Sequence, residues 1–364
     1  MHTFNELDNP YTLRFSYIPP RLIERTVVIE EIISNYVRKI PTYTGIFLTG
    51  VRGCGKTVML NEIRGRLDKA KDWITVDLNP ESNLLDSLAR GLYLIPELRA
   101  LFIKAKIDFS VLGIGVHVEG AELIASSEED ALLLMLRTLK TAGKKLFVTI
   151  DEVTYSKDVA KFSHALSSYS GEGIDIYVLM TGLAENIRNI RNKKSLTFLY
   201  RAKVMELDTL NITAIQMDYL DTLKVERERA DELAFKTRGY SLAFQALGYI
   251  YWNELSKSDK RQEVDLTKVD AELDKILSEL AYDKIWDELS STDKKILKAM
   301  ARLKTDEEYI KVENIRQEIN ISSDSFTKYR SRLLEAGVVE GSQYGYLRFK
   351  LPRFENYVEN ERRM

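Results

Sequence analysis

The sequence predicts an α/β protein: a parallel sheet of the P-loop NTPase type, then a helical lid, then a C-terminal winged-helix domain. A glycine-rich loop at residues 50–57 stands between an apolar run and a helical pattern. A second apolar run, 146–150, ends in two carboxylates, which is typical of a buried parallel strand. After Thr209 the strand patterns give way to helical ones. These three observations define the expected fold class.

Composition indicates an ordinary globular protein without a strongly charged surface. The 364 residues are 45% hydrophobic and 30% charged, and the formal net charge is -2. Cys54 is the only cysteine, so no intramolecular disulfide forms, and three scattered histidines offer no zinc spacing. The first residues lack a basic and an apolar stretch, and the most apolar segment, 240–252, is too short to span a bilayer. We therefore expect a cytoplasmic protein with no membrane contact.

The loop carries the pattern of a phosphate-binding loop. Its fixed positions are Gly50, Gly55, Lys56 and Thr57. Glycines let successive backbone N–H groups face an anion, and the helix that follows adds its positive end. Lys56 is expected to reach the β- and γ-phosphates, and the Thr57 hydroxyl to hold Mg²⁺. The residues expected to bind the nucleotide are Gly50, Val51, Arg52, Gly53, Cys54, Gly55, Lys56, Thr57 and Val58. The alternative is a glycine turn before an ordinary helix.

Polar residues follow two of the predicted strands. Asp151 and Glu152 end the run 146–150, at the edge where ligands bind in open α/β sheets. Asp151 is expected to hold Mg²⁺ through water, and Glu152 to orient or deprotonate an attacking water. Thr181 ends the next strand and is expected to reach the γ-phosphate or that water; a Thr-Gly turn explains it equally well. Arg201, in a basic segment, is a candidate to reach a neighbouring subunit's nucleotide, or belongs to a solvated face.

The remaining pattern places an extended lead-in at residues 5–25, because Pro19 and Pro20 prevent a helix there. A β-hairpin is expected at 107–119, where apolar residues alternate around two glycines. The expected helices are 27–38, 56–70, 82–94 and 126–140, with Ser82 as the cap of the third, and the expected strands are 45–48, 73–78, 145–150, 175–183 and 203–207. Past the sheet, helices are expected at 213–223, 228–237, 241–253 and 266–287.

The C-terminal segment has the elements of a winged helix. Helices are expected at 293–302, 312–319 and 322–336, with a hairpin over 338–350. The third helix would present Lys328, Tyr329 and Arg332 to DNA. Residues 291–350 hold 12 Lys and Arg against 9 Asp and Glu, a slight excess for phosphate binding, so packing against protein is nearly as well supported. The expected domains are 1–208 (ATPase core), 209–289 (helical lid) and 290–364 (winged helix and tail).

Several segments together resemble the prokaryotic AAA-type P-loop ATPases allied to the origin-recognition and initiator group and to the STAND switch ATPases. These segments are 9–11, 19–20, 24–25, 50–57, 150–153, 181–183, Arg201, 239–240, 245–248, Trp252 and 351–354. The resemblance implies a sheet in the additional-strand order, ATP and Mg²⁺ as ligands, and an ATP-driven switch. It also implies that Arg25, where relatives carry a Gly-Arg pair, passes near the adenine.

Two departures from the resembled group favour a slow switch over a fast motor. Thr181 replaces the asparagine common among initiators, and the lid lacks a matching arginine, with Arg238 as the nearest candidate. We therefore expect slow ATP hydrolysis that controls a winged-helix output on DNA. The alternatives are a STAND-like switch that contacts a protein partner or assembles with itself, and a nucleotide-held scaffold with negligible turnover.

Overall fold

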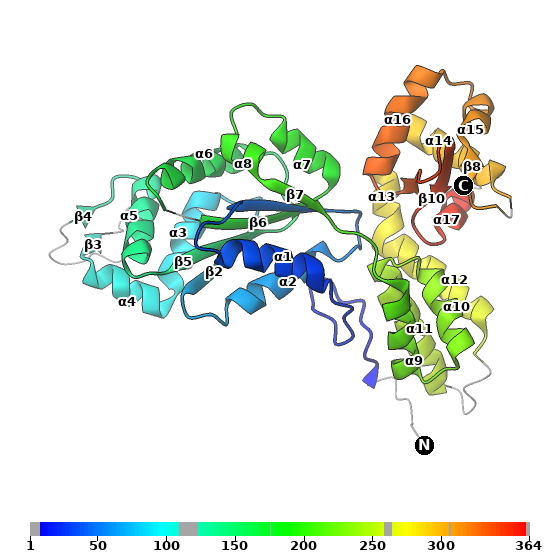
Figure 1. Ribbon diagram of the computed structural model, residues 1–364, viewed down its shortest axis with the longest axis horizontal. Coiled ribbons are helices and arrows are strands. Elements are labelled where there is room, and N and C mark those ends of the chain that lie inside the picture. Colours follow the sequence, from blue (N-terminus) through cyan, green and yellow to red (C-terminus); the bar gives the residue numbers. More distant parts are fainter. Residues whose placement is uncertain (1–7, 109–122, 175, 258–263, 306, 362–364) are drawn as a thin grey trace. The chain divides into compact units, whose positions relative to one another are not determined.

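A computed structural model describes residues 8–108, 123–174, 176–257, 264–305 and 307–361 (Figure 1). The chain divides into two compact units. The sheet unit comprises Thr26–Thr49 and Lys56–Glu206. The C-terminal unit comprises the described residues of Met1–Arg25, Gly50–Gly55 and Leu207–Met364.

The described part of the sheet unit contains a five-stranded parallel sheet in the order β2-β5-β6-β1-β7. Its strands are β1 (Gly45–Thr49), β2 (Trp73–Leu78), β5 (Lys145–Ile150), β6 (Ile176–Gly182) and β7 (Lys203–Glu206). β6 lies between β1, which leads into the glycine-rich loop, and β5, which ends before Asp151. This is the additional-strand order, so the fold class predicted from the sequence is confirmed.

The central strands are apolar because both of their faces are covered. Every residue of β1 and β6 is buried. The helices α1 (Thr26–Val37) and α2 (Lys56–Leu67) lie along one face of the sheet (Figure 1). The opposite face carries α3 (Leu84–Leu94), α6 (Lys157–Gly171) and neighbouring helices, whose leucines and phenylalanines form one hydrophobic core with Phe47 and Val148. Continuous apolar strands are what such a two-sided cover requires.

Among its described residues, the sheet unit contains four further helices, of which only one begins with a side-chain cap. They are α4 (Pro96–Lys104), α5 (Glu128–Thr141), α7 (Ala184–Arg191) and α8 (Thr197–Arg201). Ser127 caps α5 by accepting from the Asp130 N–H, and Asn83, not the expected Ser82, caps α3. The predicted hairpin falls mostly outside the described residues. Its flanks form β3 (Ile107–Asp108) and β4 (Leu123–Ile124), which pair in parallel.

The C-terminal unit begins with the helices of the predicted lid. These are α9 (Ile212–Leu223), α10 (Arg227–Thr237), α11 (Ser241–Lys257), α12 (Leu266–Leu277) and α13 (Asp283–Glu288). A single long helix was predicted over 266–287; instead a π-helical turn, η4 (Ser278–Tyr282), separates α12 from α13. The lead-in is anchored on this bundle by Tyr11, which is buried and donates to Asp218 at 2.6 Å.

The rest of this unit contains the three predicted helices and the predicted hairpin in the expected order, together with a short strand and a final helix that were not predicted. They are α14 (Ser291–Leu303), β8 (Ile310–Lys311), α15 (Val312–Glu318), α16 (Ser323–Glu335), β9 (Val339–Glu340), β10 (Tyr346–Phe349) and α17 (Phe354–Asn360). β10 is the middle strand of a small antiparallel sheet with β8 and β9. Ser290 forms a capping box with Asp293 at the start of α14.

One hydrophobic core runs through the whole C-terminal unit. It joins Tyr11 of the lead-in, Leu247 of the lid and Leu333 of α16. The sequence placed a domain boundary between 289 and 290, and that boundary stays a prediction. The change from sheet to helices was expected at 208 and lies next to the division at 206 and 207.

Candidate nucleotide site

The glycine-rich loop connects β1 to α2, as the sequence predicted. Gly53 and Gly55 have φ angles of 74° and 95°, in the left-handed region that favours glycine. A Cβ at Gly53 would lie 2.3 Å from the Tyr240 hydroxyl, so a larger residue does not fit there either. Residues 50–55 belong to the C-terminal unit, and Lys56 and Thr57 begin α2 in the sheet unit.

In the sheet unit, two elements bring hydroxyl groups to the carboxylate of Asp151. The Thr57 hydroxyl, from the first turn of α2, donates to Asp151 Oδ2 at 2.7 Å. The Thr181 hydroxyl, from β6, donates to the other oxygen, Asp151 Oδ1. The register explains the meeting, because Ile150 of β5 pairs with Met180 of β6 and the residues after them are neighbours. Two of the predicted site residues therefore converge on a third.

Glu152 has a constrained backbone next to this carboxylate. Its φ is 53°, which is unusual for a residue other than glycine and costs on the order of 1–3 kcal/mol. Its N–H donates to Thr181 Oγ1 at 3.0 Å and to Asp151 Oδ1 at 3.1 Å, and these bonds hold the turn. The Glu152 side chain is exposed. Strain of this kind, at the end of a sheet strand, directs a carboxylate away from the strand and into solvent.

Thr181, whose hydroxyl was predicted to reach the γ-phosphate or its attacking water, bonds through that hydroxyl to a protein group. Its side chain is fully buried, and its hydroxyl is directed to Asp151. In this arrangement Thr181 orients Asp151 and the Glu152 turn. A direct contact with phosphate or water stays a prediction.

Hard oxygen ligands of this kind fit Mg²⁺. The Thr57 hydroxyl and an Asp151 carboxylate oxygen already lie at hydrogen-bond distance, and Mg²⁺ sites commonly combine one or two protein oxygens with waters and phosphates. Lys56 is buried at the start of the same helix. No cluster of three or more His, Cys, Asp or Glu side chains suited to a metal occurs in the described residues.

In the C-terminal unit, Arg25 braces the loop. Its guanidinium donates to the carbonyls of Cys54 and Asp208, each at 2.9 Å, and to Ser241 Oγ at 3.2 Å. Burial is the main cause that lowers the pKa of Arg25. A contact between Arg25 and adenine stays a prediction; the observed role is to hold the backbone of the loop.

The lid contacts the loop through Tyr240, which lies in one of the segments that carry the resemblance, and through Ser241, to which no role was assigned. Tyr240 donates to the Arg52 carbonyl at 2.6 Å, and Ser241 donates to the Cys54 carbonyl at 2.9 Å. The start of this helix was recognised in the sequence, but only as a place to look for an arginine. Arg238 itself donates to the Phe349 carbonyl at 2.8 Å, and so anchors the lid to β10.

The residues predicted to contact a partner differ in how exposed they are and in whether they already form contacts within the chain. Arg201 is exposed at the end of α8 and forms no hydrogen bond or ion pair with the part of the chain that the structure describes. Lys328 is exposed on α16. Tyr329 packs against the core, and Arg332 forms an ion pair with the buried Asp293 at 3.0 Å. The predicted DNA-reading face thus has one fully exposed cation among these three residues.

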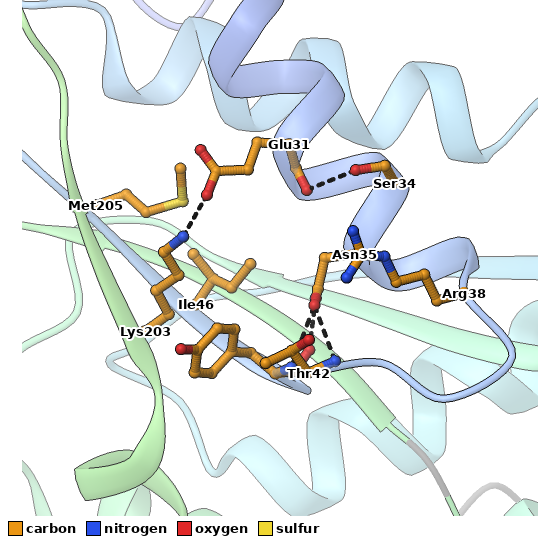
Figure 2. Close-up of a pocket in the computed structure, with 9 residues that line it drawn as sticks. Glu31, Ser34, Asn35, Arg38, Thr42, Ile46, Lys203 and Met205 are labelled. Atoms are coloured by element: carbon orange, nitrogen blue, oxygen red, sulfur yellow. Dashed lines mark hydrogen bonds and ion pairs between the residues drawn. The ribbon is translucent and has the colours of Figure 1, made fainter.

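A cavity of about 150 Å³ in the sheet unit lies apart from the predicted site residues (Figure 2). It is formed by α1, the segment that enters β1, and the edge strand β7. Figure 2 shows the Asn35 side chain bonded to the backbone of that segment and Lys203 paired with Glu31. The polar side chains here stabilise the entry to β1.

No helix in the described parts of the chain combines the length and the apolar character needed to cross a membrane.

Comparison with known proteins supports the fold. A search of curated proteins found no match. The sequence profile of the family described as "Domain of unknown function (DUF8462)" matches residues 279–358, less than half of the chain.

Two solved archaeal structures are similar over almost their whole length. The Aeropyrum pernix ORC2 protein has a TM-score of 0.61 at 14% identity, with 95% of this chain and 96% of that chain covered. The Walker-type ATPase PABY2304 of Pyrococcus abyssi has a TM-score of 0.57 at 13% identity, with coverage of 93% and 96%. At these identities the likeness establishes the fold alone: this chain shares its fold with the two solved proteins.

Proposed function

We propose that this protein binds ATP with Mg²⁺ and hydrolyses it slowly, as a molecular switch. The observation that carries the proposal is the 2.7 Å contact between the Thr57 hydroxyl and Asp151, at the start of α2 and the end of β5. Together with the glycine-rich loop and Lys56, this pair supplies the groups that phosphate and its metal require. The Aeropyrum protein with the same fold is described in complexes with ADPNP and ADP, which favours adenine as the base.

Each residue has a defined role in this proposal. Lys56 neutralises charge on the β- and γ-phosphates, and Thr57 and Asp151 hold Mg²⁺ directly or through water. When bound, Mg²⁺ neutralises phosphate charge. Glu152 accepts a proton from, or orients, the attacking water, because its turn directs the carboxylate into solvent. Thr181 fixes the orientation of Asp151.

The test of hydrolysis is Glu152→Gln, which keeps the side-chain shape but removes the base. ATP binding is expected to stay at the wild-type level, while turnover falls by about 100-fold or more. Glu185→Gln, an exposed glutamate at the start of α7, is the matched control and should leave both unchanged. Unchanged turnover in Glu152→Gln would remove Glu152 from this role. Absence of ATP binding by the wild-type protein would refute the proposal as a whole.

For the output, we propose that the C-terminal elements form a winged helix that contacts DNA through α16. The order of helices and the small antiparallel sheet support it, as does the exposed Lys328. Duplex binding should weaken as salt rises, and Lys328→Ala should reduce the slope of log K against log salt by about one. Lys295→Ala, an exposed lysine on α14, is the control. No duplex binding at low salt, with or without ATP, would refute this output.

The second candidate output is a protein contact, as in a STAND-like switch. The observation that favours it is the ion pair between Arg332 and the buried Asp293, which uses one of the cations expected to face DNA. Size measurement with ADP and with a non-hydrolysable ATP analogue, on the wild type and Arg201→Ala, tests self-assembly. A nucleotide-dependent assembly that Arg201→Ala abolishes would place Arg201 at a neighbour's nucleotide.

A further inference from the structure

Three consecutive carbonyls of the glycine-rich loop are held by three consecutive residues of the lid. The Arg52 carbonyl accepts from the Tyr240 hydroxyl at 2.6 Å, and the Gly53 carbonyl accepts from the Leu242 N–H at 3.1 Å. The Cys54 carbonyl accepts from the Ser241 hydroxyl at 2.9 Å. We call this set of bonds, made by residues 240–242 to residues 52–54, the loop clasp. All of its members belong to the C-terminal unit.

The clasp determines which way the loop's N–H groups face. In a planar trans peptide unit the C=O and N–H bonds point in opposite directions. The carbonyls of residues 52, 53 and 54 share their peptide units with the N–H groups of Gly53, Cys54 and Gly55. Since the lid draws these three carbonyls to itself, the three N–H groups turn away from the lid. The Cys54 N–H donates to the Val51 carbonyl at 3.3 Å, so the N–H groups of Gly53 and Gly55 are the two placed to face an anion, as in a phosphate-binding loop.

A loop with two left-handed glycines has many alternative conformations when nothing holds it. Fixing three of its carbonyls removes those alternatives before phosphate arrives, so less ordering entropy is lost on binding. Tyr240 is suited to this task because its side chain is buried, and burial raises its pKa and keeps the hydroxyl protonated as a donor.

The side chains of the loop extend this connection into the C-terminal helices. Arg52 forms an ion pair with Glu288, at the end of α13, at 2.6 Å. Val51 packs against the core of the unit and lies near Gly337, which follows α16. The variable positions of the phosphate loop therefore contact the lid and the elements proposed for output.

We propose that Tyr240 and Ser241 are positioning residues of the phosphate loop, and that the loop clasp links nucleotide binding to the stability of the C-terminal unit. This inference rests on the proposed ATP binding. In this proposal the clasp couples the lid to the nucleotide without a lid arginine, since Arg238, the nearest candidate, donates to the Phe349 carbonyl of β10. Linkage makes this coupling reciprocal: if the clasp raises the affinity for nucleotide, bound nucleotide stabilises the clasp by the same free energy.

The test compares ATP affinity in Tyr240→Phe, Ser241→Ala and Tyr251→Phe. Tyr240→Phe and Ser241→Ala each remove one hydrogen bond to the loop, so the Kd for ATP should rise by about threefold to tenfold. Tyr251 is a buried tyrosine on the same helix, and Tyr251→Phe is the matched control with wild-type affinity. Ser241→Thr restores a hydroxyl and should restore affinity, which a purely steric role would not predict.

Hydrogen exchange supplies the second readout. ATP should slow exchange at the start of α11, including the Leu242 N–H, and around Gly337 in the wild type, and this protection should shrink in Ser241→Ala. Ser241 is only half-buried, so Ser241→Ala keeps the test valid if Tyr240→Phe fails to fold. Wild-type affinity and protection in the clasp variants would refute the clasp alone. Failure of the wild type to bind ATP would refute the proposed function, and the role of the clasp with it.

Discussion

Replacing Thr181 by valine should separate the stability of the sheet from the chemistry of the candidate site. Valine keeps almost the same shape in this fully buried position but removes the hydroxyl that donates to Asp151. The Glu152 N–H keeps Asp151 Oδ1 as an acceptor at 3.1 Å, so it is not left without a partner. The loss is therefore mainly one hydrogen bond to a charged group, about 1.5–3 kcal/mol. For a unit of this size, the melting temperature should fall by roughly 3–12 °C.

The same change should slow Mg²⁺-dependent turnover more than stability alone explains. Loss of a group that orients a metal-binding carboxylate typically lowers metal affinity or activity by about 10- to 100-fold. The assay is ATP turnover as a function of Mg²⁺, measured well below the melting transition, with Thr181→Ser as the variant that retains the hydroxyl. Thr181→Ser should stay close to the wild type in both readouts.

The chain offers a matched control in the neighbouring strand. Thr149 is also fully buried, and its hydroxyl donates to Asp77 on β2 at 2.5 Å and not to Asp151. The Asp77 side chain is 54% exposed, so Thr149→Val should cost only about 0.5–1 kcal/mol and leave the Mg²⁺ dependence unchanged. If both valine variants have the same effect on turnover, the reasoning about Asp151 is wrong.

Three further predictions concern the C-terminal unit. Gly248→Ala would place a Cβ 2.6 Å from the ring of Tyr11, so it should destabilise the unit by about 1–3 kcal/mol in thermal unfolding. The control is Gly65→Ala, which has no neighbour within 4 Å and should be neutral or stabilising. Arg238→Met removes the donor to the Phe349 carbonyl of β10, so the free energy of unfolding should fall by about 1–3 kcal/mol. Proteolysis of residues 338–351 should also be faster, and wild-type resistance to protease would contradict this. Burial raises the pKa values of Tyr219 and Tyr282 above the ordinary value of about 10, so the folded state favours the neutral phenols. The stability they contribute is complete below about pH 10 and is lost as pH rises above it, which a tyrosinate absorbance titration followed in parallel with circular dichroism can check.

Much of the sheet unit could be predicted because its signals are local. The glycine-rich loop and the strand before it are contiguous, and a continuous apolar run such as 146–150 directly reports burial on both faces of a sheet. The helix over 266–287 was predicted without its interruption, since apolar periodicity continues through the π-helical turn. Ser82 was predicted as a helix cap and Asn83 is the observed one; serine and asparagine both suit that position, and only the backbone decides between them.

The partners of polar side chains could not be predicted in the same way. Periodicity shows that a residue is buried and does not show which distant group it meets. Nothing in the sequence indicated that Thr181 donates to Asp151 or that Arg332 pairs with Asp293; the contacts predicted for them with phosphate and DNA stay predictions. Each of these contacts joins residues some thirty or more positions apart in the chain, so it depends on how the elements pack.

By itself, then, the amino-acid sequence determined the fold class, the order of the main sheet strands and the position of the glycine-rich loop, because each of these depends on residue types at short and fixed spacing. Only the tertiary structure decided how that loop is held. Tyr240 and Ser241 lie almost two hundred residues after the carbonyls they bind, and their local pattern does not show which groups they bind. A hydrogen bond over that separation exists because the lid packs against the loop, and packing is a property of the folded chain.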